Sequence, residues 1–389
     1  MPNVGFRSSA LSTAGSDDAT VFSPRYTILQ RVKFALIVFV IQNIIFAPLH
    51  LFGLLHDLLH PRRPNRPTVI KSYTGNKSLS VRIFFPMSHR PSSTVKRLPT
   101  LLTIHGGGFA LGHPRDNDTW NSTFASHHET LVIALNYTKA PWSPFPTPIY
   151  DLESLITSIL ADASLPIDPS RIALAGFSAG GNLALAVSQL ESIRTRVAAV
   201  VALYPVVDFA APVETKLSTR RFKPEVGGFR AKEKDSLLSV ADAFSWAYVR
   251  PGQRIDHTLL SPYYAEREAF PRGVFLIGCE MDILGQEAWR MACKLAGKKI
   301  PAVGEVMGRR KPGEVGELIL EGDERFAFEE RVGGCWYRWL LVPDMIHGFD
   351  QKMEMKDQTL VEDARMKKEK VISVIGEWLF SGPFGKTAK

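Results

Sequence analysis

The stretch Gly176-Phe177-Ser178-Ala179-Gly180-Gly181 decides the fold of this chain. It follows an apolar run of strand length, 171–175, and opens a stretch of helical periodicity, 179–190. In a strand–turn–helix elbow of this kind the serine backbone is strained, only small neighbours are tolerated, and the hydroxyl projects above the sheet. The helix N-terminus behind it favours developing negative charge. The pattern predicts Ser178 as a nucleophile, with Gly176 and Gly180 as its small neighbours.

A second glycine-rich turn, His105-Gly106-Gly107-Gly108-Phe109, follows an earlier apolar run, 101–105. Acyl transfer needs backbone N–H donors aimed at an oxyanion, and glycines let the backbone come close enough to supply them. We expect the N–H groups of Gly106, Gly107 and Ala179 to form this hole, with Gly108 completing the turn and His105 holding the loop. A phosphate-binding loop is the alternative, but neither a following lysine nor a GxGxxG spacing is present.

Ser178 needs a general base, and a base needs an acid to orient it. Of the ten histidines, His347 comes just after the expected last strand, 335–342, and after the serine in chain order. Asp282 follows the apolar run 274–278 and lies between serine and histidine. Glu280 and Asp344 compete with it, although Asp344 is so close to His347 in sequence that it would need an unusual turn. We predict a Ser178–His347–Asp282 triad.

Strand and helix patterns alternate through the body of the chain. The expected strands are 69–73, 79–85, 101–105, 131–136, 171–175, 197–203, 274–278 and 335–342, and the expected helices are 151–161, 179–190, 284–296 and 361–379. Such alternation is typical of an α/β fold with a mostly parallel sheet and helices on both faces. Ligands of such sheets bind at the carboxyl ends of the strands.

Two segments interrupt the alternation inside one expected domain, 65–385. The segment 212–264 is long and contains an aromatic-rich helical stretch, so we expect a helical cap over the site. The segment 298–334 is rich in glycine and in charges of both signs, so we expect a solvated surface insertion.

The composition of the 389 residues excludes a disordered or collagen-like chain, because 45% are hydrophobic and 22% charged. The net charge of +8 is unevenly distributed. Residues 1–72 hold eight basic and three acidic residues, a net +5, which leaves +3 for the rest. No nucleic-acid recognition motif appears, so no nucleic-acid partner is expected. The short basic cluster 220–223 is expected to be solvated surface.

The N-terminal fifth divides into a basic tip, 1–33, expected to be disordered, and an apolar helix, 34–60. From Phe34 to Leu55 no residue is charged, which is long enough to cross about 30 Å of hydrocarbon. A single-pass membrane anchor is the favoured interpretation, with the endoplasmic reticulum a plausible location and the orientation open. An interfacial or lid helix is the alternative, because Asn43, His50 and Asp57 fall on one helical stripe. A buried helix of the soluble domain is the third.

The order and spacing of these motifs resemble the hormone-sensitive-lipase family of α/β-hydrolases, which includes arylacetamide deacetylase. The residues that carry the resemblance are His105–Phe109, Asn136-Tyr137, Ala140-Pro141, Pro144-Phe145-Pro146, Gly176–Gly181, Tyr204–Asp208, Asp282 and His347-Gly348-Phe349. The chain departs from the family pattern where Phe177 replaces an acid, where Asp344 replaces a small residue, and in a doubled interval from Asp282 to His347. These departures resemble fungal members.

The resemblance implies a helical cap and hydrolysis of small hydrophobic carboxylic esters through an acyl-serine intermediate, with Ser178, His347 and Asp282 as the triad. No metal or organic cofactor is implied. Amide deacetylation or thioester release would use the same residues, and a non-catalytic ligand binder could be built on the same scaffold.

Overall fold

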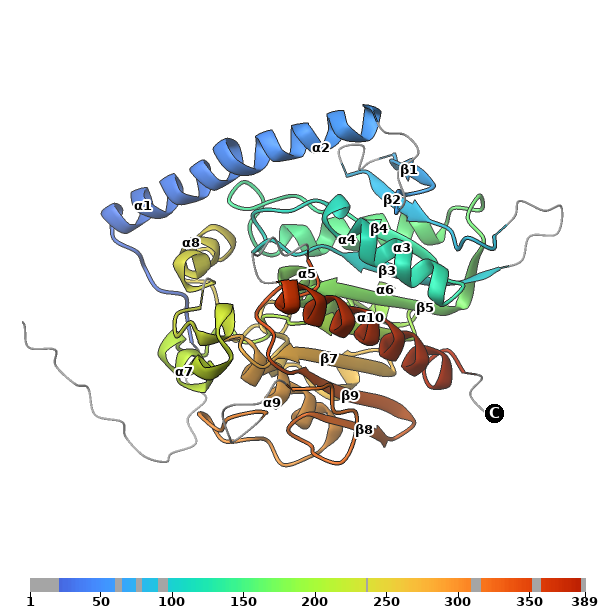
Figure 1. The fold of residues 1–389 in the computed structure, drawn as a ribbon. Coiled ribbons are helices and arrows are strands. Elements are labelled where there is room, and N and C mark those ends of the chain that lie inside the picture. The colour runs from blue at the N-terminus through green and yellow to red at the C-terminus, as the bar shows by residue number, and fades with distance from the viewer. Residues whose placement is uncertain are drawn as a thin grey trace, which may run out of the picture.

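A computed structural model describes residues 21–59, 65–74, 79–89, 97–235, 237–308, 316–351 and 358–385. Its centre is a nine-stranded sheet in the order β1-β2-β4-β3-β5-β6-β7-β9-β8 (Figure 1). The pairs from β4 to β9 are parallel, whereas β1 and β2 at one edge and β8 at the other pair antiparallel. The predicted mostly parallel α/β sheet is confirmed.

The strands are short and almost wholly apolar at the centre of the sheet, because both of its faces are covered. Their bounds are β1 Val69–Lys71, β2 Val81–Phe84, β3 Leu98–Ile104, β4 Leu131–Leu135, β5 Ile167–Phe177, β6 Ala199–Leu203, β7 Gly273–Cys279, β8 Ala327–Val332 and β9 Cys335–Val342.

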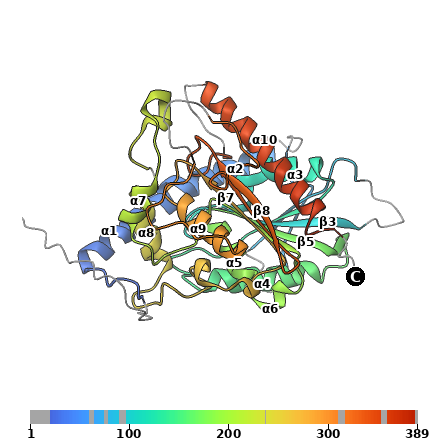
Figure 2. The same cartoon turned by 90° about the horizontal axis from the view of Figure 1, so that it is seen from below.

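Helices form a layer on each face of the sheet (Figure 2). One layer holds α3 (Asp118–His127) and α10 (Gln358–Ser381), and the other holds α4 (Thr147–Leu160), α5 (Ala179–Val187), α6 (Glu191–Arg194) and α9 (Gly285–Ala296). Each layer of helices packs against one face of the sheet and forms a hydrophobic core with it. Three further helices lie outside the layers: α7 (Val213–Thr219), α8 (Leu238–Tyr248) and the long N-terminal helix.

The long N-terminal helix consists of α1 (Ile28–Phe39), a π-helical segment (Val40–Phe46) and α2 (Ala47–Leu59). It runs along the outside of the molecule from α8 to the β1–β2 edge (Figure 1). The expectation of a disordered tip through residue 33 is wrong for residues 21–33, because the helix already begins at Ile28, where Thr27 and Gln30 form a capping box. Residues 1–20 lie outside the described part of the chain.

The interruption at 298–334 is only partly the surface excursion that its charges predict. Its last third contains β8, which pairs with β9 along six residues and extends the sheet by one strand. Met307, Phe326 and Phe328 are buried in the core. Charge density misled the sequence interpretation here because only the first two residues of β8, Ala327 and Phe328, are buried, whereas the three charged residues that follow, 329–331, are half-buried or exposed.

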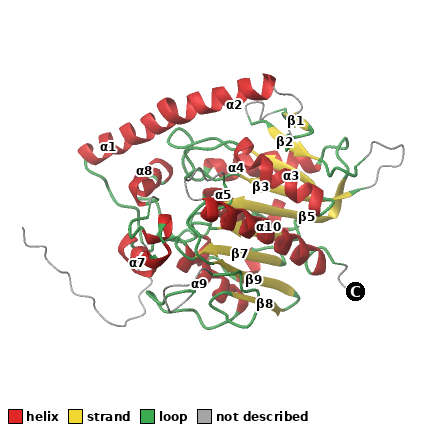
Figure 3. Ribbon diagram, viewed as in Figure 1, coloured by secondary structure: helices red, strands yellow, loops and turns green. Residues whose placement is uncertain are grey.

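The order of the strands places the site. β3 pairs with β4 on one side and with β5 on the other. The chain therefore leaves β3 toward one edge of the sheet and leaves β5 toward the opposite edge. Such a switch point leaves a crevice at the carboxyl ends of the two strands. The loop His105–Phe109 leaves β3 here, and Ser178 follows β5. Figure 3 shows the cap helices α7 and α8 beyond this edge of the sheet.

The turn after β5 requires glycine on both sides of the serine. A Cβ on Gly176 would overlap the Gly180 carbonyl, and one on Gly180 would overlap the carbonyls of Ile104 and His105. The turn therefore packs backbone against backbone, both within itself and against the end of β3.

We predict that Gly180→Ala destabilises the protein by about 3 kcal/mol or more, because neither carbonyl can move without disturbing β3. The control is Gly252→Ala, where φ is +78° but the added Cβ meets nothing within 4 Å, so that only backbone strain is added. That variant should lose only about 1 kcal/mol. Urea denaturation measures both, and equal losses would contradict the close packing of the elbow.

Candidate active site

Ser178, His347 and Asp282 come together in one hydrogen-bonded chain. The Nε2 atom of His347 lies 2.7 Å from Oγ of Ser178, and its Nδ1 atom lies 2.7 Å from Oδ2 of Asp282. The carboxylate can only accept, so Nδ1 carries the proton and Nε2 is free to accept the serine hydroxyl. The three residues come from the loops after β5, β7 and β9, as the sequence predicts.

The serine backbone has φ +55° and ψ −120°, a conformation that costs energy for any residue with a side chain. The turn is fixed by the Ser178 N–H, which donates to the carbonyl of Leu203 at 2.9 Å, and by the Ser178 carbonyl, which accepts from Gly181 at 2.8 Å. Strand β6 and the first turn of α5 therefore hold the hydroxyl in place.

The electrostatics of the site favour a positive charge on the imidazole. Burial lowers the pKa of His347, but the Asp282 carboxylate outweighs burial, and Asp235 and Asp350 act in the same direction, so the pKa is raised above 6.5. An imidazole whose pKa is raised in this way is a stronger base toward the serine proton.

The donors predicted for an oxyanion line the same space. Gly106 lies so close to Ser178 that a Cβ on Gly106 would sit 3.2 Å from the serine Cβ. Within the described part of the chain, the N–H groups of Gly106 and Gly107 have no hydrogen-bond acceptor. Ala179 is the first residue of α5, where an N–H has no acceptor inside its own helix. All three are available to a ligand atom beside Ser178.

His105 is buried behind the glycine turn and does not contact Ser178. Its Nδ1 lies 2.7 Å from the carbonyl of Gly106, which can only accept, so the proton is on Nδ1 and Nε2 is an acceptor. The Nζ atom of Lys139 lies 3.3 Å from that Nε2, 2.9 Å from Oδ1 of Asn136, and also donates to the carbonyl of Tyr137. The three protons of the ammonium group thus meet three acceptors.

Lys139 is a residue of the site that the sequence reasoning missed. Its ammonium lies 3.8 Å from the centre of the Tyr137 ring, and that ring stacks on His105 at 4.6 Å. Burial lowers the pKa of Lys139 to about 7, and burial and Lys139 together lower that of His105. Its position in the loop that follows β4 was the available signal, because β4 pairs in parallel with β3 and the carboxyl ends of the two strands lie together.

The two carboxylates that competed with Asp282 have other partners. Glu280 and Asp344 are completely buried, and both form ion pairs with Lys223. The Asp344 N–H also donates to Glu280 at 2.9 Å. Burial raises the pKa of Asp344, but the Lys223 ammonium outweighs it and the net pKa is lowered.

The expectation that the basic cluster 220–223 is solvated is therefore wrong for two of its members. Lys223 is 3% exposed, and Arg220 pairs with Asp235 at 3.2 Å and donates to the carbonyl of Met281 at 3.0 Å. Both cations attach the cap segment to the loops that contain Asp282 and His347. The sequence did not reveal the two acidic partners of Lys223 because they lie 57 and 121 positions away.

Phe177, which stands where the family has an acid, is buried on the far side of the elbow. Its ring contacts Trp120 edge-on at 5.1 Å and lies 6.5 Å from Tyr204. An apolar side chain suits this position because α3 covers it. The side chain leaves the nucleophile and the N–H donors unchanged.

Ser178 lies between two cavities. One, of about 230 Å³, is lined by the glycine turn, Phe46 of the N-terminal helix and His347. The other, of about 130 Å³, is mainly apolar and is lined by residues that include Phe209, Val213 and Leu284. Phe244 of α8 lines both cavities and divides them. The cap therefore shapes both sides of the serine.

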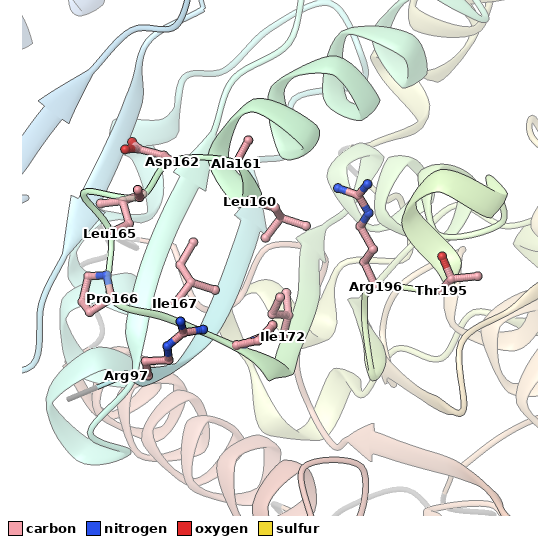
Figure 4. A pocket seen from close by; sticks show the side chains of 12 residues that line it. Arg97, Leu160, Ala161, Asp162, Leu165, Pro166, Ile167, Ile172, Thr195 and Arg196 are labelled. Carbon is pink, nitrogen blue, oxygen red and sulfur yellow. The ribbon is translucent and has the colours of Figure 1, made fainter. Parts of the chain in front are cut away.

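A larger hollow, of about 830 Å³, lies at the opposite edge of the sheet (Figure 4). Ile167 and Ile172, which line it, belong to the amino-terminal half of β5, whereas Ser178 follows the other end of that strand. Arg97, Asp162 and Arg196 give it a mixed charge. This hollow is separate from the serine site.

The serine elbow, the switch-point crevice and the order serine, aspartate, histidine define the α/β-hydrolase class of fold. A sequence profile described as the alpha/beta hydrolase fold matches residues 101–309, more than half of the chain. The chain therefore belongs to the alpha/beta hydrolase fold family.

Curated relatives match parts of the chain. It is 34% identical over 135 residues to carboxylesterase NlhH from Mycobacterium tuberculosis, covering 34% of this chain and 40% of that protein. It is 32% identical over 193 residues to an acetyl-hydrolase from Streptomyces hygroscopicus, covering 49% and 59%. The chain thus spans less than two thirds of these relatives. A match to arylacetamide deacetylase-like 2 from Homo sapiens, 33% identical over 136 residues and 33% of each chain, confirms the resemblance noted above.

Solved structures share the fold. An esterase from Pyrobaculum calidifontis superposes with a TM-score of 0.57 at 20% identity, covering 81% of this chain and 86% of that one. Carboxyl esterase 2 from the fungus Tuber melanosporum has a TM-score of 0.56 at 19% identity, covering 82% and 89%.

We predict that Lys223→Met destabilises the protein by about 3–5 kcal/mol, because it removes the cation that pairs with both buried carboxylates, Glu280 and Asp344. Lys232→Met, an exposed lysine of the same cap segment, should change stability by less than about 0.5 kcal/mol. Thermal unfolding of the two variants measures the difference. Equal melting temperatures would show that the buried ion pairs do not hold the cap.

Proposed function

We propose that this protein hydrolyses carboxylic esters through an acyl-serine intermediate, with Ser178 as nucleophile, His347 as general base and acid, and Asp282 as the residue that orients the imidazole. The observation that carries the proposal is the continuous chain of two 2.7 Å hydrogen bonds through His347. A serine is a weak nucleophile unless a base takes its proton, and this arrangement supplies that base.

Acylation starts when Ser178 Oγ attacks the ester carbonyl carbon while its proton passes to Nε2 of His347. The Asp282 carboxylate stabilises the imidazolium that forms. The N–H groups of Gly106, Gly107 and Ala179 donate to the oxyanion, and one such donor is worth about 3 kcal/mol in the transition state. The imidazolium then protonates the departing alkoxide, which leaves as the alcohol.

Deacylation repeats the same steps with water. His347 takes a proton from the water, the oxygen attacks the acyl carbon, and the proton then returns to Ser178 Oγ as the acid leaves. One ester and one water are consumed, and one acid and one alcohol are formed. Ser178 and His347 return to their starting states, so no other reactant is needed.

The substrate is a small hydrophobic ester. The apolar cavity of about 130 Å³ accommodates a short apolar group, and the cavity of about 230 Å³ on the other side of Ser178 accommodates the second half of the ester. The names of the relatives, carboxylesterase and acetyl-hydrolase, support this class.

We also propose that the protein attaches to a membrane through the apolar stretch from Phe34 to Leu55. It is supported by the helix Ile28–Asp57, which is long and apolar enough to cross a bilayer and of which only 11% of the most apolar window is buried. A core helix of a soluble domain would be mostly buried.

We expect Ser178→Ala to lower kcat/KM for p-nitrophenyl acetate and butyrate by about 10⁴ or more, because no other hydroxyl can replace the nucleophile. Labelling by a fluorophosphonate probe should also disappear. The control is Ser192→Ala, an exposed serine on α6, which should leave both unchanged. Activity that survives in Ser178→Ala would refute the acyl-serine mechanism, and wild-type protein that neither labels nor turns over would be a ligand binder.

We expect kcat/KM to fall as the pH drops through a midpoint above 6.5, because the raised pKa of His347 makes the imidazole an imidazolium that cannot accept the serine proton. In Asp282→Asn the lowering effect of burial is no longer opposed by the carboxylate at 2.7 Å, so the pKa of His347 should fall. NMR titration of His347 in both proteins measures this. An unchanged pKa in Asp282→Asn would contradict the assigned orienting role.

A further inference from the structure

The N-terminal helix is fastened to the catalytic body at several points along its length. Phe34 and Val38 are buried, and the Phe34 ring lies 6.3 Å from that of Trp246 on the cap helix α8. In the π-helical segment the amide nitrogen of Gln42 donates to the carbonyls of Ala110 and Ala140, both at 2.8 Å. These are specific contacts to the cap and to the loops after β3 and β4.

The carboxyl-terminal end of the helix is held by charges. Asp57 forms ion pairs with Arg115 at 2.9 Å and with Arg82 at 3.7 Å, and Arg82 is almost fully buried. Gly53 lies directly against the Arg115 side chain, where a Cβ would not fit without moving the guanidinium. Of the polar stripe that the sequence indicated on this helix, Asp57 and His50 face the protein, the His50 ring lying 4.4 Å from that of His113, whereas Asn43 is exposed.

The chain before the helix is bonded to the same body. The N–H of Ser23 donates to Gln253 at 2.8 Å, its hydroxyl donates to Arg250 at 2.6 Å, and the N–H of Ile255 donates to Val21 at 2.9 Å. A 30-residue helix is about 45 Å long. Because contacts along this length hold the helix to one body, both of its ends lie on the same side of a bilayer that touches its outer face. While these contacts are kept, the helix cannot cross a membrane.

The outer face of the helix is apolar from end to end. Large hydrophobic side chains that are at least 40% exposed occur at Ile28, Leu29, Val32, Leu36, Phe39, Ile44, Ile45, Leu51, Phe52, Leu54, Leu55 and Leu59. A soluble monomer rarely leaves so long an apolar surface open to water. A helix that directs Gln42 and Asp57 to the protein and most of its exposed apolar side chains to the outside suits the boundary between headgroups and acyl chains.

The surroundings of this face favour a lipid surface over a second copy of the chain. Arg25, Arg31 and Lys33 are exposed at the amino-terminal end, where they can meet anionic headgroups. Trp142 is 90% exposed and lies two residues from Ala140, to which the helix is bonded. An indole exposed beside an apolar helix is typical of a bilayer interface.

A cavity of about 560 Å³ lies between the helix and the body. It is lined by Ala47 and Leu49 of the helix and by Lys139 of the body, and it shares three lining residues, Phe46, Gly112 and Asp116, with the cavity that contains Ser178. The two cavities therefore adjoin, and together they run from the membrane-facing helix to the nucleophile.

We propose that the N-terminal helix lies in the plane of one membrane leaflet without crossing it, and that the cavity beneath it takes ester substrates from that leaflet to Ser178. The first half replaces the single-pass anchor favoured by the sequence and stands on the fastening contacts alone. The second half rests on the proposed function and assigns its substrates to esters that partition into membranes.

Flotation of the full-length protein with phosphatidylcholine–phosphatidylserine vesicles tests the docking surface. We expect Leu36→Asp/Phe52→Asp to lower the bound fraction at least tenfold, because two exposed apolar side chains would no longer enter the leaflet. The control, Ile300→Asp/Val303→Asp, places the same charges on exposed apolar residues far from the helix in sequence and should float like wild type. A wild-type protein that stays off vesicles and elutes as a dimer would overturn the lipid assignment.

Labelling with a membrane-impermeant maleimide tests the in-plane arrangement. The protein is expressed with Arg25→Cys or Val303→Cys, each combined with Cys335→Ser to remove the partly exposed native thiol, and sealed membrane vesicles are prepared from the cells. We expect the two positions to be labelled from the same side of the membrane. Labelling from opposite sides would show a spanning helix and overturn the proposal.

Two substrates test the route. Leu36→Asp/Phe52→Asp should keep its rate on water-soluble p-nitrophenyl acetate but lose at least tenfold on p-nitrophenyl octanoate held in vesicles. Ala47→Trp, which narrows only the cavity beneath the helix, should float normally and lose activity on the vesicle-held ester alone. An unchanged rate for Ala47→Trp would overturn the route. Wild-type protein inactive on both substrates would refute the hydrolase instead, and flotation would still decide the docking surface.

Discussion

The strained backbone of Ser178 is the constraint on which the rest of the structure depends. A non-glycine residue at φ +55° is held only where its surroundings leave no alternative. Here the parallel strand β5, the first turn of α5 and the carbonyls at the end of β3 confine it, and glycines at 176 and 180 allow these parts to touch. The same confinement places the serine hydroxyl, the N–H groups of the β3 loop and the helix N-terminus around one small space, so strain and catalytic geometry have a common origin.

Around this point, buried charges connect the cap to the catalytic loops. Lys223 comes from the cap and meets Glu280 and Asp344, which stand close to Asp282 and His347 in sequence. On the other side Lys139 joins the β4 loop to His105 and through it to the glycine turn. Each ammonium group is buried with acceptors from two or more loops. Such pairs are weak sources of net stability but strongly oppose rearrangement, because moving one partner leaves a buried charge alone.

The N-terminal helix extends the same principle to the outside of the molecule. Its polar side chains Gln42 and Asp57 are directed to the body, as are the buried Phe34 and Val38, and most of its other apolar side chains are exposed. Through Phe46 it lines the cavity that contains Ser178, so the element that meets the membrane also bounds the site. In the proposed arrangement, attachment and substrate access are consequences of one helix and need no separate anchor.

By itself the sequence determined the α/β class, the elbow at Ser178, the glycine turn at His105 and the choice of His347, because each depends on a local pattern of small or polar residues at the end of an apolar strand. The sequence did not predict elements whose signals are not local. Strand β8 was hidden by a run of three charged residues, 329–331, and the helix alone did not decide between crossing and lying on a membrane. Only the tertiary structure paired Lys223 with acids more than 50 residues away and tied both ends of the helix to one body, because charge partners and anchoring contacts depend on which loops the sheet brings together.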